Sequence, residues 1–167
     1  MDAHVPLAPR AQQPPKVWRI GVLSNGAAES TRSLDDAFVQ GMRELGLVEG
    51  RDFVLERRYA EGRVQLVPGY ARELAAMNLD AVIATCTPTT RVARQAFGST
   101  PGSTPIVMAA VADPVGQQLI SSLAKPGANV TGLASQAEDI MPKMLELFAS
   151  VLPRPTTVAV LVDSSSA

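Results

Sequence analysis

Short apolar runs alternate along the chain with stretches in which apolar residues recur at helical spacing. The apolar runs predict strands at 17–24, 80–85, 104–111, 129–133 and 157–163. At 52–60 apolar and polar residues alternate, which predicts a strand near a sheet edge with one wetter face. The helical spacing predicts helices at 34–45, 66–77, 89–97, 115–123 and 140–152. Strands that alternate with helices are typical of βα units, so the sequence predicts an α/β fold with a three-layer parallel sheet.

Individual residues mark the ends of two predicted helices. Ser33 is a suitable N-cap for the first helix, and Gly46 is suited to the left-handed conformation that ends a helix. Pro142 is expected in the first turn of the last helix, where its missing N–H does no harm.

Both ends of the sequence differ from this pattern. Residues 1–16 contain four prolines and no apolar run of the length of an export signal, so we expect a disordered leader and no signal peptide. The strand at 157–163 has no helix after it, although buried parallel strands normally have helices on both faces of their sheet. We therefore expect a first lobe at 17–135, followed at 136–167 by a crossover helix and the first strand of a truncated second lobe.

Composition and charge narrow the classes of partner. The 15 Lys and Arg residues nearly balance the 16 Asp and Glu residues, giving a net charge of −1, so we expect no nucleic-acid partner. His4 is the single histidine and lies in the leader, so we expect no histidine-based metal site and no cofactor. No window approaches the roughly 18 apolar residues of a membrane span.

Ligands of an open parallel sheet bind beyond the carboxyl ends of the strands, where loops and helix N-termini converge. That rule selects the loops at 24–26, 61–62, 85–90, 112–114 and 134–135. Their hydroxyl, amide and carboxylate groups suit a small polar solute. Each loop also has a structural interpretation, since Thr89 and Thr90 can cap the helix that follows and Asp113 before a proline can start a helix.

Cys86, in the stretch AVIATCTPTT, leaves the function open. A catalytic cysteine needs a lowered pKa and usually a second acid or base, and here only a helix N-terminus is available. Two-cysteine racemases of small amino acids share this α/β style, but this chain has no second thiol. A lone cysteine otherwise packs as a small hydrophobic residue. The alternatives are a binding protein, a small α/β enzyme of racemase type using Cys86, and an interaction module whose strand at 157–163 pairs with a second copy.

Several segments together resemble a known family between about Trp18 and Asp163. Five stretches carry the resemblance, and they occur in the order of that family: RIGVLS, AFVQGMRELGLVEGRDFVLERRYAEG, DAVIATCTPTTRVARQA, TPIVMAAVADPVGQQLISSLAKPGANVTGL and MPKMLELFASVLPRPTTVAVLVD. They contain the short motifs GLVEG, TPTT, DPV and PGANVTG at the spacing of that family. The chain resembles the N-terminal lobe of the ABC transporter substrate-binding proteins, in particular the tryptophan/tyrosine type.

This resemblance implies a type I periplasmic-binding-protein lobe with the flavodoxin-like strand order 2-1-3-4-5. It also implies a periplasmic location, an ABC permease as partner, and a small amino-acid-like ligand, aromatic in the best-known members, held without catalysis in a cleft between two lobes. By position, the implied ligand contacts are Ser24, Asn25, Thr85, Thr87, Thr89, Asp113 and Ser135. Threonine hydroxyls and helix N–H groups would hold a carboxylate, and Asp113 would orient an ammonium group.

Overall fold

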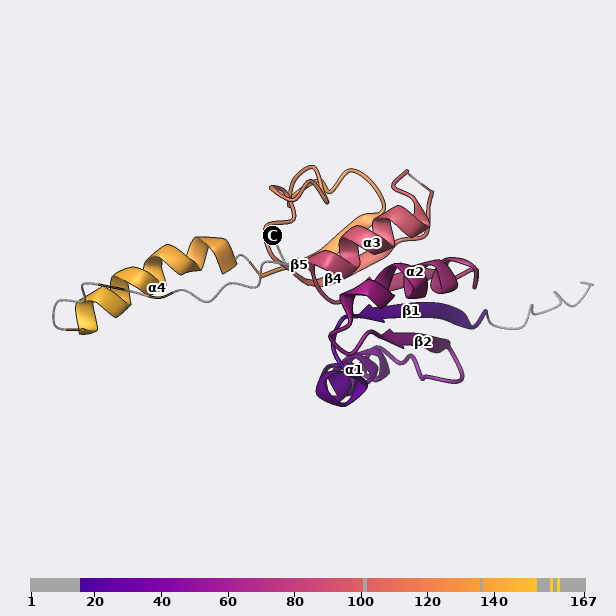
Figure 1. The fold of residues 1–167 in the computed structure, drawn as a ribbon. Helices are drawn as coiled ribbons and strands as arrows, with labels where there is room; N and C mark the ends of the chain where they lie inside the picture. The colour runs from indigo at the N-terminus through magenta and orange to yellow at the C-terminus, as the bar shows by residue number, and fades with distance from the viewer. Residues whose placement is uncertain (1–15, 101, 136, 153–156, 158, 160–167) are drawn as a thin grey trace, which may run out of the picture.

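The computed structural model describes residues 16–100, 102–135, 137–152, 157 and 159 (Figure 1). Five parallel strands form one sheet in the order β2-β1-β3-β4-β5. In chain order they are β1 (Trp18–Ser24), β2 (Phe53–Tyr59), β3 (Ala81–Ala84), β4 (Ile106–Val111) and β5 (Val130–Ala134). The predicted α/β fold and strand order are confirmed, while the strand predicted at 157–163 falls almost wholly outside the described residues.

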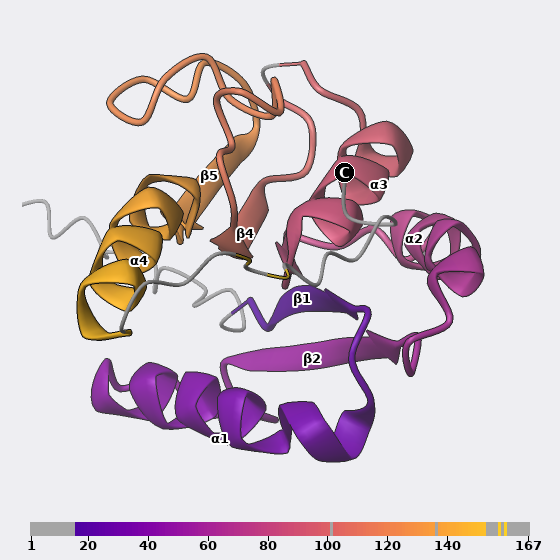
Figure 2. The same ribbon diagram turned by 60° about the vertical axis from the view of Figure 1, so that its left-hand side comes forward.

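Helices cover the sheet on both faces and so form three layers (Figure 2). The helices are α1 (Ala28–Glu44), α2 (Val67–Ala75), α3 (Thr87–Phe97) and α4 (Ala137–Val151), and the short 3-10 helix η1 (Val64–Leu66) leads into α2. α2 and α3 lie side by side on one face, and α1 lies on the other, beside β2.

The hydrophobic core lies between the sheet and the α2 and α3 layer. Leu23, Ala84 and Met108 are register partners across β1, β3 and β4, and they are at most 2% exposed. Leu74 of α2 and Ala93 of α3 are fully buried in the same cluster. Because side chains alternate along a strand, this register directs one apolar side of each strand toward these two helices.

Helix α1 is attached to β2 by an aromatic pair and by polar contacts, since none of its residues is fully buried. The ring of Phe38 lies edge-on to that of Phe53, with centroids 6.3 Å apart. The hydroxyl of Tyr59 donates to the carboxylate of Asp35, and Nε of Arg57 lies 3.9 Å from the same carboxylate. The outer face of β2 therefore binds its helix largely through charge and hydrogen bonding.

The first helix begins earlier than predicted, at Ala28, so the prediction of an N-cap at Ser33 is wrong. The hydroxyls of Ser30 and Thr31 donate to the carbonyl of Ala27 (3.0 and 2.9 Å). Serine and threonine are often unfavourable inside a helix because their hydroxyls compete for main-chain groups. Here the two hydroxyls bond a carbonyl of the first turn, so both residues fit within the helix. The predicted end is confirmed, because Gly46 has a φ of 82° just after α1.

The helix predicted at 115–123 is wrong, because these residues form turns. Asp113 and Gln118 both have positive φ, at 37° and 55°, and a left-handed residue cannot continue an α-helix. The apolar residues that suggested a helix include Leu119 and Ile120, whose side chains are buried although their main chain forms turns.

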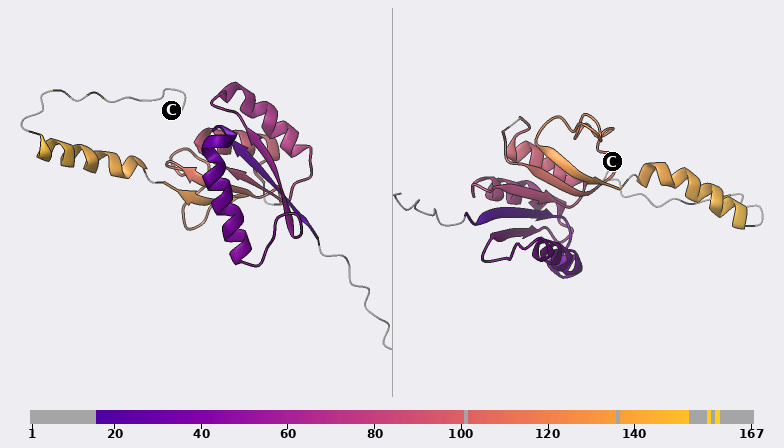
Figure 3. Two further views of the ribbon diagram at one scale, coloured as in Figure 1. Left: turned by 90° about the horizontal axis from the view of Figure 1, so that it is seen from below. Right: turned by 180° about the vertical axis from the view of Figure 1, so that it is seen from behind.

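Helix α4 projects from the body of the molecule (Figure 3). It was predicted at 140–152, and it begins at Ala137, which places Pro142 in the interior rather than in the first turn. That part of the prediction is wrong. Its large apolar side chains are exposed, at Ile140, Met141, Met144, Leu145, Leu147, Phe148 and Val151. No described helix is both long and apolar enough to cross a membrane.

Replacing Gly132 should open the pairing of β4 and β5. Its φ is 132°, and a Cβ there would overlap the main-chain carbonyl of Met108. We expect Gly132→Ala to lower the free energy of unfolding by about 2 kcal/mol or more. The matched control is Gly41→Ala in α1, where a Cβ meets nothing within 4 Å, and which should raise stability by about 0.5 kcal/mol. Urea unfolding measures both, and equal effects would contradict the assignment.

Tyr59→Phe should weaken the attachment of α1 in a pH-dependent way. Burial, aided by the hydrogen bond to Asp35, raises the pKa of Tyr59 to about 12. An acid whose pKa is raised by folding stabilises the fold below its unfolded pKa, about 10 for tyrosine, and loses that contribution as pH rises toward 12.

The free energy of unfolding of Tyr59→Phe should therefore be about 1 kcal/mol lower than wild type at pH 7, and the difference should shrink between pH 10 and 12. Urea unfolding at pH 7, 9 and 11 tests this. Tyr70→Phe on α2 is the control for losing a tyrosine hydroxyl at pH 7. A difference that stays constant with pH would refute the role of the Asp35 contact.

Candidate functional site

The strand order reverses between β1 and β3, since the chain leaves these neighbours toward opposite faces of the sheet. Open parallel sheets bind ligands in a crevice at the carboxyl ends of two such strands, and the β1 and β3 crevice denotes that place in this fold. Ser24 ends β1 and is 1% exposed, and Thr85 directly follows β3. The Thr85 hydroxyl donates to the Ser24 oxygen at 3.3 Å, and the Thr85 N–H donates to the carbonyl of Leu23 at 3.3 Å. The structure thus brings together two of the residues predicted from the sequence.

Asn25 supplies an unpaired polar atom at the same place. Its Oδ1 is buried and has no hydrogen-bond partner among the described residues. The loop is fixed on both sides, because the N–H of Gly26 donates to Ser24 Oγ (3.1 Å) and the N–H of Gly62 donates to the Asn25 carbonyl (2.7 Å). A buried acceptor without a partner costs free energy, which a donor on a bound ligand would recover.

The N-terminus of α1 follows this loop and is not capped by a side chain. Its N-cap residue is Ala27, and no side chain accepts a hydrogen bond there. The first N–H groups of a helix point outward and carry partial positive charge, so they bind carboxylates and other anions. Sequence reasoning missed this feature because it placed the start of the helix at Ser33. The stretch Gly26-Ala27-Ala28, which offers no capping side chain, is the signal that could have found it.

The N-terminus of α3, in contrast, is capped by hydrogen bonds among its own first residues. Cys86 is the N-cap residue, and its N–H donates to Thr89 Oγ1 at 3.0 Å. The hydroxyls of Thr89 and Thr90 both donate to the Cys86 carbonyl at 2.9 Å, and both side chains are fully buried. Thr87 opens the helix, half-buried. Of the predicted threonines, Thr85 and Thr87 thus lie nearer the surface, and Thr89 lies beneath it.

The thiol of Cys86 takes part in the same cap. Its Sγ lies 3.4 Å from the Thr89 hydroxyl. That neighbour is neither a base nor a cation, and a cysteine nucleophile usually has one of these beside it. The described residues also contain no cluster of three His, Cys, Asp or Glu side chains that could hold a metal ion.

Asp113 and Ser135 form a second group at the same edge, beyond β4 and β5. Both are exposed. Oδ1 of Asp113 accepts the N–H of Gly116 at 2.8 Å, so half of this carboxylate closes the turn that replaces the predicted helix. The N–H of Ser135 donates to the carbonyl of Val111 at 2.9 Å, which extends the pairing of the two strands. The structure shows no hydrogen bond between this described group and the Ser24 and Thr85 pair.

Comparison with known proteins identifies the family to which this sequence is similar. The sequence model of the family described as ABC transporter substrate binding protein matches residues 19–167. A tyrosine-binding protein of Clostridioides difficile (strain R20291) is 29% identical over 136 residues, which are 80% of this chain and 38% of that protein. The chain therefore spans less than half the length of this curated relative.

Solved structures share the fold. A conserved domain protein from Vibrio cholerae has a TM-score of 0.70 at 29% identity, over 83% of this chain and 45% of that one. The ligand-free, open structure of a substrate binding protein with adhesive properties from Clostridium difficile has a TM-score of 0.65 at 25% identity, over 81% and 45%. An ABC domain in complex with L-Trp from Streptococcus pneumoniae matches in fold, with a TM-score of 0.64 at 24% identity, over 81% and 53%.

Thr89→Val should destabilise α3, because it removes the acceptor for the Cys86 N–H while keeping the shape of the side chain. We expect a loss of about 1 kcal/mol in the free energy of unfolding. Thr87→Val, two residues earlier and without a role in the cap, should change stability by less than about 0.5 kcal/mol. Cys86→Ser should be neutral or stabilising, because serine is a good N-cap residue. Urea unfolding of the three variants tests this, and a larger loss from Thr87→Val would refute it.

Proposed function

The chain belongs to the ABC transporter substrate binding protein family, and from this premise we propose that it binds an amino-acid-like solute for import without changing it chemically. The observation that carries the proposal is the crevice between β1 and β3. There an unpaired Asn25 oxygen, the Ser24 and Thr85 hydroxyls and the uncapped start of α1 adjoin one another along the chain and across the sheet.

These groups divide by chemistry in a way that suits an amino acid. The uncapped N–H groups of α1 and the Thr87 hydroxyl are donors, which a carboxylate needs. The Asn25 Oδ1 is an acceptor, which an ammonium group needs. The free oxygen of Asp113 is a second acceptor at the same sheet edge. A zwitterion would therefore find both of its charged groups matched.

The tyrosine-binding relative supports an aromatic amino acid as the ligand. Because this chain spans 38% of that relative, the cleft as a whole is part of the proposal. In it, the crevice described here forms one wall, the opposite wall comes from a second lobe, and the two close on the solute as a hinged pair. The same proposal places the protein outside the cytoplasm, in the periplasm, with an ABC permease as its partner.

The role of Cys86 supports the proposal of binding without catalysis. Its thiol lies within a helix cap beside a hydroxyl, and no second thiol exists in the sequence for a racemase-type reaction. We therefore assign Cys86 to folding. Cys86→Ser should leave ligand affinity unchanged, and this variant separates a binding protein from an enzyme that uses the thiol.

Titration calorimetry with L-tyrosine tests the proposal. We expect saturable binding, and we expect Thr85→Val to weaken it about tenfold, because a hydroxyl that bonds a charged group contributes roughly this much. Thr131→Val, an exposed threonine in β5, is the matched control and should bind as wild type does. Tyramine, which lacks the carboxylate, and the matching hydroxyphenyl propionate, which lacks the ammonium group, should both bind more weakly than tyrosine. Equal affinities for the three compounds would refute the assignment of the crevice.

A further inference from the structure

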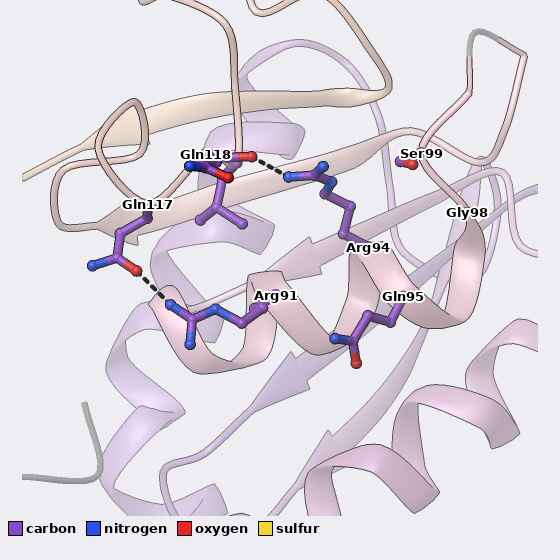
Figure 4. Close-up of a pocket in the computed structure, with 8 residues that line it drawn as sticks. Arg91, Arg94, Gln95, Gly98, Ser99, Gln117 and Gln118 are labelled. Atoms are coloured by element: carbon purple, nitrogen blue, oxygen red, sulfur yellow. Dashed lines mark hydrogen bonds between the residues drawn. The ribbon is translucent and has the colours of Figure 1, made fainter. Parts of the chain in front are cut away.

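A polar cavity lies between α3 and the connection from β4 to β5, and none of the residues assigned to the β1 and β3 crevice lines it (Figure 4). It has a volume of about 420 Å³. Arg91, Arg94 and Gln95 line it from α3, Ser99 from the loop after the helix, and Gln117 and Gln118 from the connection. Arg91 and Arg94 are three residues apart on the helix, so their side chains lie on one side of it, as Figure 4 shows.

Both guanidinium groups are held in place by neutral oxygens across the cavity. Arg91 Nη2 donates to the side-chain oxygen of Gln117, and Arg94 Nη1 donates to the main-chain carbonyl of Gln118. A guanidinium has five N–H donors in a planar fork. Each of these contacts uses one of them, so several donors on each arginine are left to bind a ligand.

The cavity carries positive charge that its own walls do not neutralise. No Asp or Glu lines it. Among the described residues, Arg91 and Arg94 take part in no ion pair, whereas Arg58 on β2 pairs with Glu73 at 2.9 Å and Arg57 with Glu49 at 3.0 Å. Two cations that share a cavity with only neutral partners repel each other, and an anion between them would relieve that repulsion.

We propose that Arg91 and Arg94 form a binding site for a small free oxyanion of the phosphate type. A guanidinium group can donate two parallel N–H bonds to two oxygens of one phosphate. Such charge-assisted bonds are stronger than the bonds that the two arginines now make to neutral oxygens. A doubly charged anion matches two cations, and Ser99 and Gln95 add neutral polar side chains to the lining of the cavity. This site is independent of the proposed amino-acid site, because it shares no residue with it.

Calorimetric titration of the full chain with inorganic phosphate at pH 8, at constant ionic strength set with sodium chloride, tests the proposal. We expect saturable binding in the wild type, weakened about tenfold or more by either Arg91→Gln or Arg94→Gln. The matched control is Arg72→Gln, which removes the same charge from an exposed position of α2 and should bind phosphate as wild type does. Saturating L-tyrosine should leave the phosphate affinity unchanged.

A second measurement keeps the test decisive if an arginine variant folds poorly. In the wild type, amide resonances of Ser99, Gln117 and Gln118 should shift with phosphate, while those of Ser24 and Thr85 should not. Absence of saturation, equal weakening in Arg72→Gln, or shifts centred on Ser24 and Thr85 would each overturn the proposal. In those cases Arg91 and Arg94 serve only to fasten the connection to α3.

Discussion

The position of β1 between β2 and β3 is the constraint on which the rest of this structure depends. Because the connections to its two neighbours run over opposite faces, α1 lies on one face and α2 and α3 on the other, and the ligand edge of such sheets is where these helices diverge.

The other end of β1, near its first residues, is fixed by two hydrogen bonds to Asp80. The N–H of Arg19 donates to Asp80 Oδ2, and the N–H of Asp80 donates to the Arg19 carbonyl, both at 2.8 Å. The first of these bonds holds the pKa of the Asp80 carboxyl below its usual value.

The two faces of the sheet are stabilised by different physics. On the α2 and α3 side the fully buried cluster around Leu74 and Met108 excludes water. On the α1 side the strands present Val107 at 37% exposure and Leu133 at 71%, and α1 itself adheres through Phe38 and the Asp35 carboxylate. The first face therefore supplies most of the hydrophobic free energy of folding, and the second responds more to pH and salt.

The sequence predicted what depends on periodicity and missed what depends on single main-chain conformations. Four strands of the described sheet follow from apolar runs and β2 follows from alternating residues, while the strand order follows from the family resemblance. The turns at 115–123 could not be predicted in this way, because the left-handed φ of Gln118 is a single main-chain conformation that apolar spacing does not encode. The same holds for the site, where sequence position brought Ser24 and Thr85 to one edge, but the unpaired Asn25 oxygen and the uncapped start of α1 depend on exact side-chain and main-chain placement.

The loop TCTPT separates two physical roles within five residues. Thr89 faces inward and its hydroxyl completes the cap of α3, so a change there alters folding before it alters anything else. Thr85 and Thr87 lie nearer the surface and make no contribution to that cap. Changes at positions 85 and 87 can therefore alter the exposed side of this loop while the helix behind it keeps its cap, so the chemistry of this sheet edge can vary without a loss of stability.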